Sequence, residues 1–115
     1  ILGILATDGT IETKLYQNAL RDEGVIPCTL DSHGQGLVMH EIYDRIKAGL
    51  PSEDESWQEI DEKLKEMGCK KALLACTELS VIKNERNLSD YYVDPMEVMA
   101  DRTIKFMKKN QNKHI

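Results

Sequence analysis

The stretch Lys-Ala-Leu-Leu-Ala-Cys-Thr-Glu-Leu, residues 71–79, places an apolar run directly before a polar turn and a second apolar segment. The run is typical of a short buried strand, and Thr77 is a plausible N-terminal cap for a helix that follows it. Cys76 would then lie at a helix N-terminus, where backbone N–H groups favour the thiolate and lower the pKa of a cysteine. The same N–H groups can hold a substrate carboxylate. The stretch therefore predicts a strand, a helix, and a thiol beside an anion-binding turn.

Strands and helices alternate along the rest of the chain. Residues 1–6 form a continuous apolar run, which is typical of a strand buried on both faces of a parallel sheet. Further strands are expected at residues 25–30, 71–75 and 91–93. Helices are expected from the turn at residues 7–10 to residue 23, then over 37–48, 52–68, 77–82 and from residue 94 onward, with residues 31–36 as a loop. This alternation predicts a single α/β domain over residues 1–115, with an open parallel four-stranded sheet flanked by helices.

Local patterns predict further details of two helices. The first long helix is expected to bury Ile11, Leu15 and Ala19 on one face. Ser52 followed by Glu55 matches a capping box and is expected to open the helix that carries the single tryptophan.

The composition limits the class of protein. A hydrophobic content of 41% and a charged content of 30% are ordinary for a globular domain. The net charge of −5 argues against a nucleic-acid partner, because phosphate binding requires clustered Lys and Arg. No stretch is long enough to cross a membrane, and none resembles a secretory signal. Cys28, Cys69 and Cys76 show no metal-type spacing, so we expect a reduced, cytoplasmic compartment and no metal site.

Polar segments follow each predicted strand. Ligands of an open parallel sheet bind beyond the carboxyl ends of its strands. The residues expected at this edge carry hydroxyls, one thiol and short polar loops; they are 7–10, 31–35, 76–78 and Asp94. His33 falls in one of them, where a solvated histidine is commoner than a partner for a cysteine nucleophile.

Several sequence blocks carry a resemblance to a known family. They are residues 3–10 (GILATDGT), Gln35 with Val38-Met39 and Ile42-Tyr43, residues 46–49 (IKAG), residues 75–79 (ACTEL) and residues 93–96 (VDPM). In this order and spacing, the chain resembles the aspartate/glutamate racemase superfamily, and most closely its aspartate racemase branch.

The resemblance implies a two-lobed protein. Chains of this family are about twice as long, with two similar α/β lobes that each contribute one cysteine to a shared active site. This sequence matches the second, C-terminal lobe only, and it begins inside an apolar strand pattern without an initiator Met. We therefore expect a missing N-terminal lobe as its partner, and a homodimer as another way to cover the exposed cleft face.

The family's chemistry implies a role for Cys76. Racemisation removes a proton from one face of the α-carbon and returns one to the other face, so two acid/base groups must flank the carbon. These racemases use no pyridoxal phosphate and no other cofactor. Carried over to this chain, Cys76 is one of the two acid/base thiols, and Thr77 holds the substrate carboxylate or amine. Glu78 matches the residue that distinguishes aspartate-type sites.

Three more residues match positions that line the cleft in the family. Thr7 and Thr10 correspond to a glycine-threonine loop, and Lys47 corresponds to a lysine that directs its charge toward the side-chain carboxylate of aspartate or glutamate. Each has an alternative role that needs no ligand. Thr10 would cap the first helix, and Lys47 would interact with a helix dipole.

Two other functions stay open from the sequence. Relatives with one working cysteine protonate a carbanion after decarboxylation or isomerise a diacid such as maleate. A non-enzymatic lobe that binds a dicarboxylic amino acid, or that pairs with itself, is the third possibility.

Overall fold

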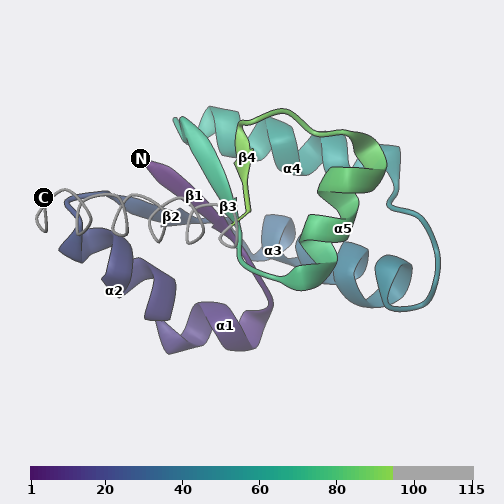
Figure 1. Ribbon diagram of the computed structural model, residues 1–115, viewed down its shortest axis with the longest axis horizontal. Coiled ribbons are helices and arrows are strands. Elements are labelled where there is room, and N and C mark those ends of the chain that lie inside the picture. Colours follow the sequence, from purple (N-terminus) through teal and green to yellow (C-terminus); the bar gives the residue numbers. More distant parts are fainter. Residues whose placement is uncertain (95–115) are drawn as a thin grey trace, which may run out of the picture.

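The computed structural model describes residues 1–94 and contains an α/β fold built on one parallel sheet (Figure 1). The strands are β1 (Leu2–Leu5), β2 (Pro27–Thr29), β3 (Lys71–Leu74) and β4 (Tyr92–Val93), in the order β2-β1-β3-β4. Every neighbouring pair is parallel. The predicted open four-stranded parallel sheet is confirmed, with each strand shorter than the sequence predicts and β2 shortened most. The helix predicted after Asp94 lies outside the described residues.

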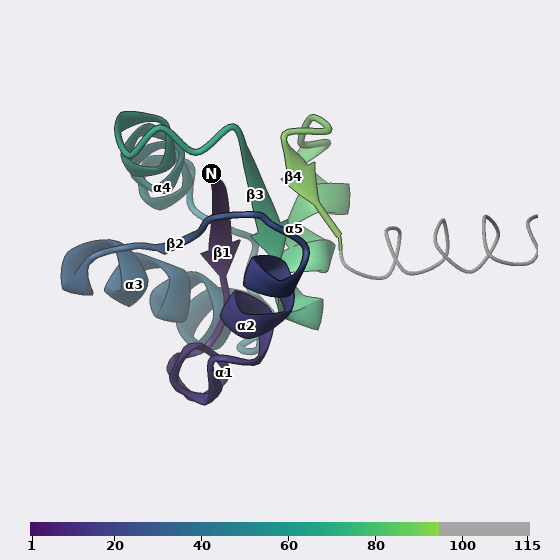
Figure 2. The ribbon, with the colours of Figure 1, turned by 90° about the vertical axis from the view of Figure 1, so that its left-hand side faces the viewer.

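Helices cover both faces of the sheet. They are α1 (Asp8–Thr13), α2 (Leu15–Asp22), α3 (Ser32–Met39), the π-helix η1 (His40–Ile46), α4 (Asp54–Glu66) and α5 (Thr77–Arg86). In Figure 2, α2 lies in front of the sheet and α5 lies behind it. This layering follows from the strand order. The chain moves across the sheet in one direction from β1 to β2 and in the opposite direction from β2 to β3 and β4, and right-handed connections in opposite directions place their helices on opposite faces. Within residues 1–94, no helix has both the length and the apolar character needed to span a bilayer.

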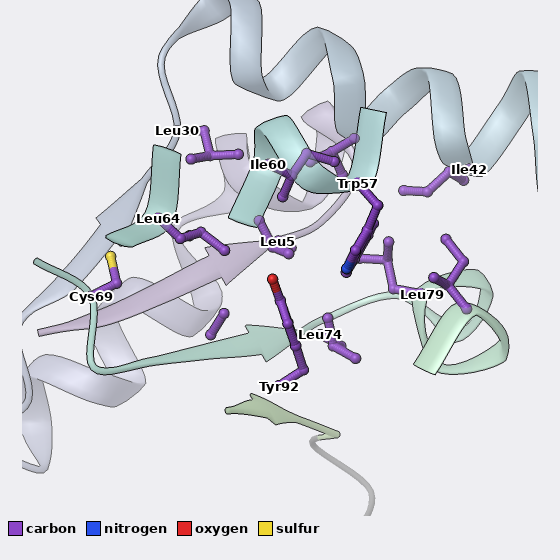
Figure 3. Packing of buried hydrophobic residues seen from close by; sticks show 13 residues of the cluster. Leu5, Leu30, Ile42, Trp57, Ile60, Leu64, Cys69, Leu74, Leu79 and Tyr92 are labelled. Atoms are coloured by element: carbon purple, nitrogen blue, oxygen red, sulfur yellow. The ribbon is translucent and has the colours of Figure 1, made fainter. Parts of the chain in front are cut away.

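The main core lies between the sheet and the helices η1, α4 and α5 (Figure 3). Its fully buried leucines and isoleucines, each at most 1% exposed, are Leu5, Ile42, Ile60, Leu64, Leu74, Leu79 and Ile82. Burial of each such side chain contributes about 1.5–3 kcal/mol. Trp57 packs in this core, with its ring centroid 5.3 Å from that of Tyr92.

The first long helix differs from the prediction. Lys14 has a left-handed φ of 62° and divides the segment into α1 and α2. The break turns α2 about its axis, so Leu15 is 65% exposed and Ala19 is also exposed. Gln17 is buried instead, and its Nε2 donates to the carbonyl oxygen of Ile11 at 3.1 Å. The predicted apolar face of this helix is therefore wrong.

Residues 31–36, predicted as a loop, belong mostly to α3. The Oδ1 atom of Asp31 accepts a hydrogen bond from the N–H of Gly34 at 2.7 Å and caps the helix. Gly34 and Gly36 favour a loop in the sequence pattern. Gly34 has a packing role instead, since a Cβ atom there would lie 2.9 Å from the Cβ of Leu30.

The capping box predicted at Ser52 does not form. Helix α4 has Glu53 as its N-cap, with no side-chain capping bond. The N–H and hydroxyl of Ser52 donate to Oε1 of Glu85 at 3.1 and 3.4 Å, and the hydroxyl accepts from Arg86 at 3.0 Å. Ser52 therefore attaches the chain before α4 to α5.

Gly3 lets α4 approach the centre of the sheet. A Cβ atom at Gly3 would lie 2.7 Å from Cδ2 of Leu64 and 3.3 Å from Sγ of Cys69. Leu64 is 1% exposed and closely packed, so it has little room to move away. The missing side chain at Gly3 is thus required by the packing of α4 on β1.

We predict that Gly3→Ala lowers the free energy of unfolding by about 1–3 kcal/mol, because the added methyl overpacks the core. Gly36→Ala is the matched control, since it lies in α3 and a Cβ atom there would meet nothing within 4 Å. The control should raise stability by up to about 1 kcal/mol, because alanine favours a helix over glycine. Urea unfolding followed by circular dichroism measures both. Equal stabilities for the two variants would contradict the packing argument.

Candidate active site

The candidate site lies at the carboxyl edge of the sheet, between β1 and β3. The chain leaves β1 toward β2 and leaves β3 toward β4 on the opposite side, so the winding reverses at this pair. Ligands of open α/β sheets bind at such a switch point. The N–H of Ala75 donates to the carbonyl oxygen of Leu5 at 2.8 Å and holds the two strand ends side by side. Thr7 and Cys76 each follow closely after one of these ends.

Cys76 is the N-cap residue of α5. Its backbone is extended, with φ −154° and ψ 137°, and its carbonyl oxygen accepts hydrogen bonds from the N–H groups of Leu79 and Ser80. The side chain is half-buried. The side chain makes no capping hydrogen bond, but the backbone N–H groups of Glu78 and Leu79 lie near enough to lower the pKa of the thiol. The predicted helix N-terminus beside the thiol is confirmed, although the cap is Cys76 and not Thr77.

Glu78 connects the other predicted residues around this thiol. Its Oε2 accepts hydrogen bonds from Sγ of Cys76 and from the hydroxyl of Thr77, both at 3.0 Å. Its Oε1 lies 3.1 Å from Nζ of Lys47, which also lies 5.3 Å from the ring centroid of Tyr43. The structure therefore brings Cys76, Thr77 and Lys47 together around the carboxylate of Glu78.

The pKa of Cys76 is raised, not lowered as the sequence predicts. Burial is the largest cause, and the hydrogen bond to Glu78 acts in the same direction. The N–H groups of Glu78 and Leu79 lower the pKa, but their effect is smaller. In this chain Cys76 therefore keeps its proton near neutral pH and donates it to a carboxylate.

The carboxyl group of Glu78 stays ionised over a wide pH range. Hydrogen bonds from Cys76 and then from Lys47 lower its pKa to about 2. The ion pair with Glu78 also raises the pKa of Lys47. A lowered carboxyl pKa adds stability above the ordinary value near 4.3, and this stability is lost only as the pH falls toward the lowered value. The charged contacts of the site are therefore intact at neutral pH.

The π-helix η1 sets the position of Lys47. The N–H of Lys47 donates to the carbonyl oxygen of Ile42 at 2.9 Å, which is the wider turn of a π-helix. Glu41 of η1 is fully buried, and its carboxylate accepts the N–H of Glu53 at 3.1 and 3.2 Å. Burial raises the pKa of Glu41. Because η1 packs on α5, this buried anchor holds Lys47 beside Glu78.

Thr7 and Thr10 lie on the β1 side of the same edge. Thr7 caps α1, since its Oγ1 accepts from the N–H of Thr10 at 3.3 Å; the predicted capping role of Thr10 is therefore wrong. Gln35 of α3 donates to the carbonyl oxygen of Ala6 at 2.8 Å and to Asp8 at 2.9 Å. The sequence assigned no site role to Gln35 or Asp8, although both fall in segments expected at this edge, 31–35 and 7–10. Their contact was not predictable, because Gln35 reaches Ala6 and Asp8 from a helix and not from the expected loop.

The remaining candidates lie elsewhere. His33 hydrogen-bonds to Glu59 of α4 at 3.0 Å with its side chain 63% exposed, so it is not a partner of Cys76. Cys28 lies within β2, and Cys69 precedes β3 and is 4% exposed. In the described part of the chain, no group of three or more His, Cys, Asp or Glu side chains forms a metal site.

We predict that Glu78→Gln lowers the pKa of Cys76, because the variant removes the negative charge beside the thiol and keeps an acceptor of similar shape. The pH dependence of Cys76 alkylation by iodoacetamide, measured by peptide mass spectrometry, should shift to lower pH, with alkylation several-fold faster at pH 8. Glu55→Gln on α4, an exposed position, is the matched control and should leave the profile unchanged. An identical profile for Glu78→Gln and the wild type would contradict the role of Glu78.

Comparisons with known proteins support one family. The model of the Asp/Glu/hydantoin racemase family matches residues 1–103. A crystal structure from Yersinia pestis, described as a candidate Asp/Glu racemase, has a TM-score of 0.63 at 26% identity, over 76% of this chain and 40% of that one. Picrophilus torridus aspartate racemase has a TM-score of 0.59 at 25% identity, over 90% of this chain and 43% of that one.

A curated relative is similar to this chain at the level of sequence. It is an uncharacterized protein of the pnlA 3′ region of Pectobacterium carotovorum subsp. carotovorum, 28% identical over 107 residues, or 91% of this chain and 71% of that protein. The chain thus spans less than half the length of the two solved structures, at 40% and 43%. It belongs to the Asp/Glu/hydantoin racemase family.

Proposed function

We propose that this chain is the second lobe of a two-lobed amino-acid racemase that acts without a cofactor, and that its substrate is aspartate. The observation that carries the proposal is the contact of Glu78 with both Cys76 and Lys47 at the switch point of a racemase-family sheet. One carboxylate there lies within hydrogen-bond distance of a thiol and of a cation.

Cys76 supplies one of the two acid/base groups. Its proton is directed at Glu78, so in the resting state Cys76 has the form that returns a proton to the α-carbon. The base that removes the first proton is a thiolate of the missing lobe on the opposite face of the substrate. In the reverse direction the two thiols exchange roles. The N–H groups at the start of α5 suit a substrate carboxylate, whose charge increases as the carbanion forms.

Lys47 supports the choice of a dicarboxylic substrate. Its ammonium group has three N–H donors, and the contact with Glu78 at 3.1 Å uses one of them. The side chain is 43% exposed, so the remaining donors are accessible to a ligand. A second carboxylate on the substrate would bind there without displacing Glu78.

We predict that Cys76→Ser in the complete protein lowers kcat for aspartate racemisation by about 10²–10⁴-fold, the usual contribution of a general acid or base. The variant should keep the far-ultraviolet circular dichroism of the wild type. Cys28→Ser is the matched control, since Cys28 lies within β2 away from the carboxyl edge, and it should remain active. Chiral chromatography of the product measures the rate. Full activity of Cys76→Ser would reject the proposal.

We also predict that Lys47→Gln raises KM for aspartate by about 10–100-fold, the loss expected for one hydrogen bond between charged groups. KM for alanine, which lacks the second carboxylate, should change little, and this comparison separates substrate recognition from damage to Cys76. Lys63→Gln, which breaks a surface pair with Asp31, is the control. A parallel loss for both substrates would exclude Lys47 as the specificity residue.

One observation favours a second candidate, a single-thiol enzyme that protonates a carbanion after decarboxylation. Cys76 is held as a thiol by Glu78 without any second lobe, and a proton donor on one face is sufficient for that reaction. The sequence of the missing lobe distinguishes the two candidates. A second cysteine motif there favours the racemase, and its absence favours the decarboxylase.

A further inference from the structure

Cys28 and Cys69, which the proposed reaction does not use, lie together on one face of the sheet. Cys28 pairs with Gly3 across β2 and β1, and the spacing of neighbouring strands is about 4.8 Å. From the other side, the Sγ of Cys69 lies 3.3 Å from the position of a Cβ atom on Gly3. Cys28 packs against the buried cluster that contains Cys69. The two thiols therefore lie near each other beside Gly3, Cys28 on the neighbouring strand and Cys69 over the glycine next to Leu64.

The two thiols are also close enough to influence each other. After burial, the nearby Cys28 is the next cause that raises the pKa of the Cys69 thiol, and both cysteines are free. Their segments are distant in sequence, one being β2 and the other the turn before β3. Two neighbouring thiols are the requirement for a disulfide that forms without rearranging the fold.

We propose that Cys28 and Cys69 are an oxidative modification site, and that hydrogen peroxide converts them to a disulfide that joins β2 to the start of β3 across β1. This inference is independent of the proposed racemase activity. It assigns a chemical role to the two cysteines that lie away from the carboxyl edge.

The order of reaction follows from burial. Cys28 is partly exposed, whereas Cys69 is 4% exposed. Burial raises the pKa of Cys69, and the contact with Cys28 acts in the same direction. Cys28 therefore reacts first and Cys69 resolves the product.

The step balances with peroxide as the oxidant. The Cys28 thiolate attacks one peroxide oxygen, the O–O bond breaks, and a sulfenic acid and hydroxide form. The sulfur of Cys69 then attacks the sulfur of Cys28, the S–O bond breaks, and the oxygen leaves as water. Two thiols and one peroxide thus give one disulfide and two waters. A thiol reductant reverses the reaction by exchange.

The experiment treats the folded chain with a small excess of hydrogen peroxide and maps the thiols by mass spectrometry under non-reducing conditions. The expected product is about 2 Da lighter and contains one cross-linked peptide pair, Cys28 with Cys69, while Cys76 remains available to iodoacetamide. The thermal midpoint should rise by at least about 5 °C, and dithiothreitol should restore the starting value.

Two controls make the result decisive. Cys69→Ser should leave Cys28 as a sulfenic acid that dimedone traps, and Cys76→Ser should leave the cross-link intact. A chain unfolded in urea should lose the selectivity for this pair. The proposal is overturned if the folded chain yields no cross-link, or if Cys76 is joined to either of the other cysteines.

Discussion

Strands β1 and β3 pair along their whole length, from Leu2 opposite Lys71 to Leu5 opposite Leu74, and both the core and the site depend on this pairing. The packing of α4 over this pair of strands requires a glycine in β1, because a Cβ atom at Gly3 would clash with Leu64 of α4. The pairing also aligns the carboxyl ends of the two strands, so the residues that follow them share one edge. The register that buries Leu5 and Leu74 thus also places the Thr7 turn beside Cys76.

Electrostatics at that edge is a competition between a helix N-terminus and a carboxylate. The N–H groups of α5 favour a thiolate, whereas burial and Glu78 favour the thiol, and the second pair of effects is larger. Glu78 has this influence because Lys47 and Thr77 keep it ionised and in place. The position of Lys47 in turn depends on the π-turn of η1 and on the buried Glu41. The protonation state of Cys76 therefore depends on how η1 packs.

The fold class was predictable because apolar runs and polar turns alternate strictly along the chain, and tertiary contacts did not override that pattern. Contacts that the local sequence cannot show explain the errors. The left-handed conformation of Lys14 changed which side of α2 is buried. Asp31 capped a helix that contains two glycines, and Ser52 hydrogen-bonded to α5 and did not cap α4. Within the site, sequence spacing brought Cys76, Thr77 and Glu78 together, but the raised pKa of Cys76 depended on burial and on the direction of the Glu78 side chain.

The most direct test of the account is the distribution of deuterium when the complete protein acts on L-aspartate in ²H₂O. If Cys76 and a thiol of the other lobe act on opposite faces, the D-aspartate formed early carries deuterium at the α-carbon, while the recovered L-aspartate carries almost none. Cys76→Ser should abolish the labelled product. Equal label in both enantiomers from the first turnovers, or labelled D-aspartate that persists without Cys76, would contradict the account.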